Sequence, residues 1–204
     1  MNASRWLSFA AAALLAAPAS AQKYVDADGK LRVALIKMPF SGERNVTEFS
    51  GGPDYLESGG LLPLLEELGV RLKPDTPTVK LSKEEEDDYG TWHRLALANR
   101  HLGDYVAENE REGWFTVGLE ANCNSVMGVL GGLQRSGAGS RPLRVGLVFI
   151  DAHGDFNTPE TTLSGMLGGM PVAISTGLCL RNLRVTSGLE PALPIPYVVL
   201  GAVR

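Results

Sequence analysis

The sequence has little of several features that mark particular classes of protein. It has only two cysteines in 204 residues, too few for a disulfide framework. Its net charge is −4 and it carries no basic stripe, which argues against nucleic acid as a partner. No stretch after residue 21 is long and apolar enough to predict a membrane span. These absences leave an ordinary globular protein, long enough for one domain with a substantial core.

The first 21 residues differ in kind from the rest. Arg5 precedes an Ala/Leu-rich stretch over residues 6–17, and Pro-Ala-Ser-Ala follows at residues 18–21. A charged start, a short apolar core and a small-residue site are typical of a secretory signal. We therefore expect cleavage after Ala21 and export to the periplasm or the medium, with residues 22–204 as the mature chain. An uncleaved anchor or a buried first helix are the alternatives.

Strand and helix signals alternate along the remaining chain. Short apolar segments predict strands at residues 31–38, 70–72, 114–119, 145–150 and 196–203. Helices are expected at residues 55–68, 89–111, 124–133 and 171–180, with a solvated helix start at 83–88. This order predicts an α/β protein of three layers, with helices on both faces of a mostly parallel sheet.

Three potential metal ligands follow the apolar run at residues 145–150, which predicts a buried parallel strand. Asp151, His153 and Asp155 come where an open α/β sheet holds its site, and alternate residues of an extended segment project to the same side. We therefore expect the three side chains to converge. Such donors suit Mn²⁺, Fe²⁺ or Zn²⁺ better than Ca²⁺. The alternative is a polar strand end, with a turn-capping aspartate and a merely hydrogen-bonded histidine.

The fifteen residues from 151 to 165, DAHGDFNTPETTLSG, resemble the central motif of the ureohydrolase family, the arginases, agmatinases and formiminoglutamases. The resemblance implies an arginase-like fold and a pair of Mn²⁺ ions held by Asp151, His153 and Asp155. It also implies that Asp151 bridges the ions and that Asp155 is the catalytic residue that hydrogen-bonds the attacking hydroxide.

The second half of the same motif implies a substrate site. By the resemblance, Asn157, Thr162 and Ser164 hold the distal carboxylate or amine of the substrate by hydrogen bonds. The substrate is then a small guanidino or formimino compound, similar to arginine or agmatine.

Two positions depart from the family pattern. Cys123 stands where the Gly-Gly-Asp-His-Ser motif of the family supplies a further ligand through its histidine, and Asn122 stands at the aspartate. A thiolate favours Zn²⁺ or iron over Mn²⁺, and the helix start expected here predicts a lowered thiol pKa. Alternatively Cys123 is a small buried hydrophobe, unpaired or paired with Cys179 after export. Gly168 stands where arginases carry a proton-shuttling histidine.

The resemblance covers residues 31–204, whereas the family continues with an Asp-x-Asp pair that completes its binuclear site. No Asp-x-Asp occurs after Asp155. We therefore expect residues 22–204 to form the N-terminal two thirds of an arginase-like domain, incomplete at the C-terminus and inactive alone. In the family the late strands lie between the strands expected here at residues 114–119 and 145–150. Those strands should leave a gap or close up, and either arrangement is expected to separate Cys123 from Asp151.

Together these features predict a divergent exported ureohydrolase. It would hydrolyse a C–N bond of its substrate by a metal-activated hydroxide and release urea or an amide. A catalytically silent protein of the same fold that binds a metal or a cationic ligand is the alternative. Metal identity, substrate identity and oligomeric state stay open, a homo-oligomer being one alternative.

Overall fold

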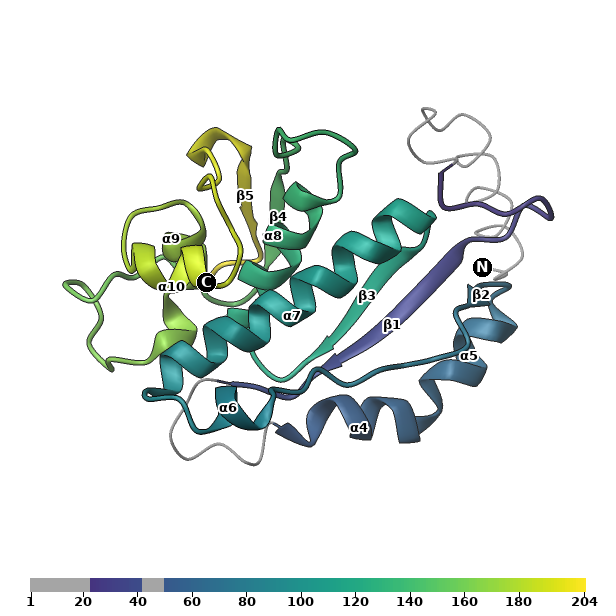
Figure 1. Ribbon diagram of the computed structural model, residues 1–204, viewed down its shortest axis with the longest axis horizontal. Helices are drawn as coiled ribbons and strands as arrows, with labels where there is room; N and C mark the ends of the chain where they lie inside the picture. Colours follow the sequence, from purple (N-terminus) through teal and green to yellow (C-terminus); the bar gives the residue numbers. More distant parts are fainter. Residues whose placement is uncertain (1–22, 42–49) are drawn as a thin grey trace.

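The structure, a computed structural model, describes residues 23–41 and 50–204 (Figure 1). Its strands are β1 (Arg32–Met38), β2 (Arg71–Leu72), β3 (Phe115–Glu120), β4 (Leu147–Ile150) and β5 (Val198–Gly201). Its α-helices are α4 (Gly52–Leu56), α5 (Leu62–Glu67), α6 (Lys83–Glu86), α7 (Thr91–Glu112), α8 (Val126–Arg135), α9 (Pro171–Ser175) and α10 (Arg181–Thr186). Short turns of other helix types are η1 (Glu57–Leu61), η2 (Cys123–Ser125), η3 (Leu167–Gly169) and η4 (Ile195–Tyr197). The signal peptide expected at residues 1–21 lies outside the described residues.

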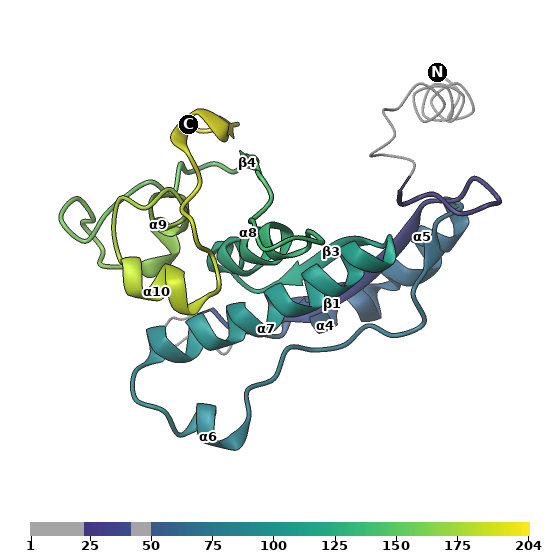
Figure 2. The ribbon, with the colours of Figure 1, turned by 45° about the horizontal axis from the view of Figure 1, so that its top comes forward.

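Strand β1 is the middle strand of a parallel sheet ordered β2-β1-β3. It pairs with β3 in register from Val33 and Phe115 to Met38 and Glu120. Val33 packs with leucines of η1 and α5, whereas Met38 packs with side chains of α7 and α8 in the larger core cluster. Figure 2 shows α4 and α5 on one side of β1 and α7 on the other. The expected three-layer α/β arrangement with parallel strands is confirmed.

Strands β4 and β5 form a second parallel sheet, in register from Leu147 and Val198 to Ile150 and Gly201. Within the described residues β3 and β4 belong to different sheets, as in the first of the two expected arrangements. The parallel strand expected at residues 145–150 is found as β4, but the prediction that it is buried is wrong, since Val148 and Ile150 are 68% and 75% exposed. Leu147 packs against the large core cluster, so only one face of β4 is covered.

The helix expected at residues 55–68 is confirmed as the run α4-η1-α5, which is interrupted where Gly60 adopts a φ of 94°. The long helix expected at residues 89–111 is α7, which ends at Gly113 with a left-handed φ of 75°. The helix expected at residues 171–180 is too long. It stops at Ser175, because Gly177 takes a φ of 83°, and a separate α10 follows. No helix in these described ranges combines the length and apolar character needed to cross a bilayer.

Helices α7 and α8 pack unusually closely, which fixes the end of β3 against the core. A Cβ added to Gly132 would collide with the carbonyl oxygen of Gly103 and lie 2.7 Å from Cβ of Val106. The buried Asn99 joins the two helices, because its Oδ1 accepts a hydrogen bond of 2.8 Å from the amide of Gly128. The small residues of α8 therefore allow backbone-to-backbone contact, and η2 at the start of α8 is held in place.

Candidate metal centre

Cys123 lies at the join between β3 and α8, where the backbone is tightly held. The amide of Ala121 donates to the carbonyl of Met38 and extends the ladder between β3 and β1. Asn122 then caps the following turn, since its Oδ1 accepts a hydrogen bond of 3.0 Å from the amide of Asn124. Cys123 is the first residue of η2, in agreement with its predicted place at a helix start.

Asp151 and Asp155 lie at the carboxyl end of β4. The amide of Asp151 donates to the carbonyl of Gly201, which continues the β4–β5 ladder by one residue. Asp155 has a φ of 45°, a left-handed conformation that aspartate tolerates better than most residues. Its carbonyl accepts a hydrogen bond of 3.0 Å from Val172 at the start of α9. Both carboxylates are therefore positioned by backbone hydrogen bonds to neighbouring elements.

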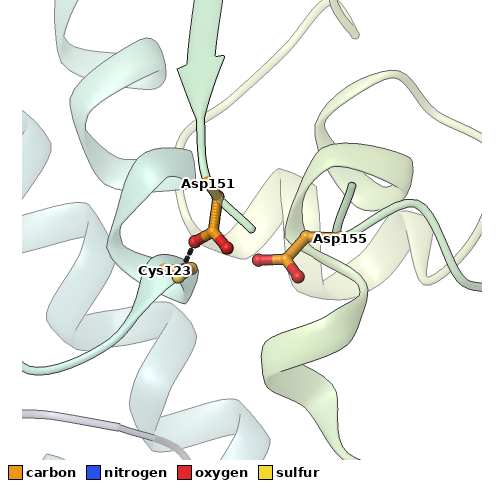
Figure 3. A group of neighbouring side chains, drawn as sticks. All are labelled: Cys123, Asp151 and Asp155. Atoms are coloured by element: carbon orange, nitrogen blue, oxygen red, sulfur yellow. Dashed lines mark hydrogen bonds between the residues drawn. The ribbon is translucent and has the colours of Figure 1, made fainter. Parts of the chain in front are cut away.

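The side chains of Cys123, Asp151 and Asp155 point toward one another (Figure 3). The thiol of Cys123 lies 3.6 Å from Oδ2 of Asp151, and one ligand atom from each residue lies within 4.8 Å of the others. The expected separation of Cys123 from Asp151 is wrong. Although β3 and β4 do not pair, the elements that follow them are packed on one core, because Met127 of α8 and Leu167 of η3 are buried in the same cluster.

His153 does not join this group in the described part of the chain. Its side chain is 78% exposed, and Nδ1 lies 3.4 Å from Oδ1 of Asp151. The backbone bends after Ile150 instead of continuing extended, and the amide of His153 donates to the same Oδ1 at 2.8 Å. The alternation argument therefore fails for this histidine, and its role as a ligand stays a prediction.

The thiol of Cys123 and the carboxylates of Asp151 and Asp155 can each carry a negative charge, and these charges repel one another. Burial, followed by the facing carboxylates of Asp155 and Asp151, raises the pKa of the Cys123 thiol to about 12. The expected lowering by a helix start is wrong, since burial and two nearby carboxylates both disfavour a negative charge on the sulfur. Burial also raises the pKa of Asp155, whereas the hydrogen bond from the amide of His153 lowers that of Asp151. Both Cys123 and Cys179 are free thiols, so the disulfide alternative is not found.

The donor set fits one divalent cation. Oδ2 of Asp155 is buried and has no hydrogen-bond partner, although a buried carboxylate oxygen without a partner is costly. A cation between Cys123, Asp151 and Asp155 would compensate that oxygen. The described residues do not fit a complete Mn²⁺ pair, because they offer one group of three ligands, one of them a soft sulfur.

The three ligands line a pocket of about 850 Å³. Asn157 and Ser164, two of the predicted substrate-binding residues, also line it. Thr162 is not among the lining residues, and its Oγ1 accepts a hydrogen bond from the amide of Gly165 within the loop. Gly168 lines the pocket opposite Asn122, whose Nδ2 would lie 3.3 Å from an added Cβ. The substrate-binding roles of Asn157, Thr162 and Ser164 stay predictions.

Sequence reasoning did not identify Asn122 as a lining residue of this pocket. It lies between Cys123 and Gly168, and its side chain faces both the helix start and the pocket. The sequence does carry a signal for Asn122, since asparagine directly before a helix start is a favoured N-cap. A cap at the carboxyl end of a strand lies where α/β folds hold their ligands.

Comparison with known proteins gives one consistent group of relatives. No protein-family model matches the chain. Arginase-2, mitochondrial, from Bos taurus is 31% identical over 184 residues, which cover 84% of this chain and 49% of the relative. Arginase from Bacillus caldovelox is 29% identical over 177 residues, covering 84% and 58%. The chain thus spans about half the length of the curated relatives that it matches.

Solved structures agree with the curated relatives. The structure of arginase from Bacillus caldovelox matches with a TM-score of 0.68 at 27% identity, covering 85% of this chain and 58% of that one. Entamoeba histolytica arginase, solved in complex with L-ornithine, matches with a TM-score of 0.67 at 25% identity, covering 85% and 57%. Each match covers 85% of this chain, so the arginase-like fold is confirmed for the matched part.

Proposed function

Since the chain belongs to the arginase/ureohydrolase family, about half the length of whose curated members it spans, we propose that it forms part of a ureohydrolase active site. The proposed reaction is hydrolysis of a C–N bond in a guanidino or formimino substrate. The observation that carries the proposal is the convergence of Cys123, Asp151 and Asp155 in a pocket that Asn157 and Ser164 also line. Family membership implies a binuclear manganese centre, of which this group would hold one cation.

The side chains of the pocket support distinct roles in such a reaction. When bound, a divalent cation supplies a positive charge that makes hydroxide available near neutral pH. Asp155 would accept a hydrogen bond from the attacking water through the carboxylate oxygen that does not face the cation. Asn157 and Ser164 would bind the distal polar group of the substrate and orient its guanidinium carbon toward that water. The L-ornithine bound by the Entamoeba relative is consistent with an amino-acid-like substrate here.

A second candidate is a catalytically silent member of the family. Gly168 occupies the position where the resemblance places a proton-shuttling histidine, and a glycine carries no titratable side chain. Such a protein would bind a cation through Cys123, Asp151 and Asp155 without turning over substrate.

A turnover assay separates the two candidates. The protein is incubated with arginine, agmatine and other guanidino compounds in Mn²⁺, Zn²⁺ or Fe²⁺, and release of urea or ammonia is measured. Asp151→Asn should lower turnover at least about 100-fold, since even partners outside the ligand shell cost about 10–100-fold. Asp75→Asn, in an exposed loop, is the matched control and should leave turnover unchanged. Metal binding without any turnover would favour the silent protein.

A further inference from the structure

The geometry of the group in Figure 3 matches one coordination shell. Sulfur and oxygen ligands of a tetrahedral Zn²⁺ lie about 2.0–2.3 Å from the ion, which places them about 3.5 Å from one another. The thiol of Cys123 lies 3.6 Å from Oδ2 of Asp151, and the atom offered by Asp155 lies within 4.8 Å of both. Three ligands on rigidly held backbone leave one position for water or substrate, as in catalytic zinc sites.

A second, independent observation points to a cation at this place. Asp155 is only 7% exposed, its Oδ2 has no hydrogen-bond partner, and its carboxylate is directed at Asp151 and Cys123. In the described residues no lysine or arginine forms an ion pair with either aspartate. A buried carboxylate beside a second carboxylate is unfavourable until a positive charge lies between them.

The sulfur decides which cation fits. Mn²⁺ stands at the bottom of the stability order of divalent first-row metals and prefers oxygen ligands, whereas thiolates select zinc and iron. The side chain of His153 is 78% exposed and does not belong to the group of ligands that converge in the described part of the chain. We infer that Cys123, Asp151 and Asp155 bind a single thiophilic divalent cation of the Zn²⁺ class in preference to Mn²⁺. This inference deepens the proposed function and rests on it for what the cation does, though not for its binding.

Metal binding to the 204-residue protein tests the inference without any substrate. Zn²⁺ and Mn²⁺ affinities are measured by competition with a chromophoric chelator, and Co²⁺ is added as a spectroscopic probe. We expect one equivalent of Zn²⁺, tighter binding of Zn²⁺ than of Mn²⁺, and a thiolate-to-cobalt charge-transfer band in the near ultraviolet. Cys123→Ser should abolish the band and weaken Zn²⁺ binding at least about 100-fold. Cys179→Ser, the matched control at the other free thiol, should change neither.

A further variant guards against loss of folding. Cys123→His replaces the thiolate by an imidazole, so it should retain metal binding, lose the charge-transfer band and bind Mn²⁺ relatively better. Circular dichroism checks that each variant is folded. Equal or tighter binding of Mn²⁺ by the unmodified protein would overturn the inference, as would a band that persists in Cys123→Ser or disappears in Cys179→Ser. Zn²⁺ binding without turnover would count against the hydrolase alone, and turnover with a preference for Mn²⁺ would count against this inference alone.

Discussion

Replacing Glu120 by glutamine should stabilise the protein at neutral pH and leave it unchanged in acid. Glu120 is the last residue of β3, three positions before Cys123, and its carboxylate lies against Gly118. Burial raises its pKa from 4.5 to about 7. The folded protein therefore holds this proton more tightly than the unfolded chain, and stability falls as pH rises from 4.5 to about 7.

The magnitude follows from that difference. A rise from 4.5 to about 7 corresponds to about 3 kcal/mol, because one pH unit is worth about 1.36 kcal/mol. The side chain keeps some exposure, so this is an upper bound and about 1–2 kcal/mol is expected. Glu120→Gln cannot ionise, so its advantage should grow between pH 4.5 and 7 and then stay constant.

Urea denaturation at a series of pH values, followed by tryptophan fluorescence, measures the effect. Glu67→Gln, an exposed glutamate on α5, is the matched control and should follow the unmodified protein at every pH. Parallel stability curves for Glu120→Gln and the unmodified protein across this pH range would refute the reasoning, because they would show that Glu120 titrates alike in the folded and unfolded states.

Two further predictions concern the site and the core. Asp155→Asn should stabilise the metal-free protein by about 1–3 kcal/mol, because it removes a buried charge whose Oδ2 has no partner, and asparagine tolerates the φ of 45°. The same variant should lose the Zn²⁺-dependent rise in Tm, and lower stability in EDTA would contradict this account. Gly132→Ala should destabilise the protein by about 2 kcal/mol, because its Cβ collides with the backbone of α7, whereas Gly139→Ala has no atom closer than 4.0 Å and should be neutral in thermal unfolding.

The sequence alone determined the order and type of most elements. The apolar run at residues 31–38 became β1, and the helix expected at residues 89–111 became α7 within one or two residues. It also placed Asp151 and Asp155 after the carboxyl end of a strand, where the structure has them at the end of β4. Such features follow from local periodicity and turn chemistry, which act over a few residues.

The tertiary structure decided which side chains meet. Cys123 and Asp151 are 28 positions apart, and their contact depends on how α8 and η3 pack on one core, which no local pattern encodes. With the bend after Ile150, His153 does not join Cys123, Asp151 and Asp155 in the described structure, although its sequence spacing favours convergence with the aspartates. The sequence also did not predict that one face of β4 is exposed. An apolar run shows only that burial is favourable, whereas packing partners decide whether burial occurs.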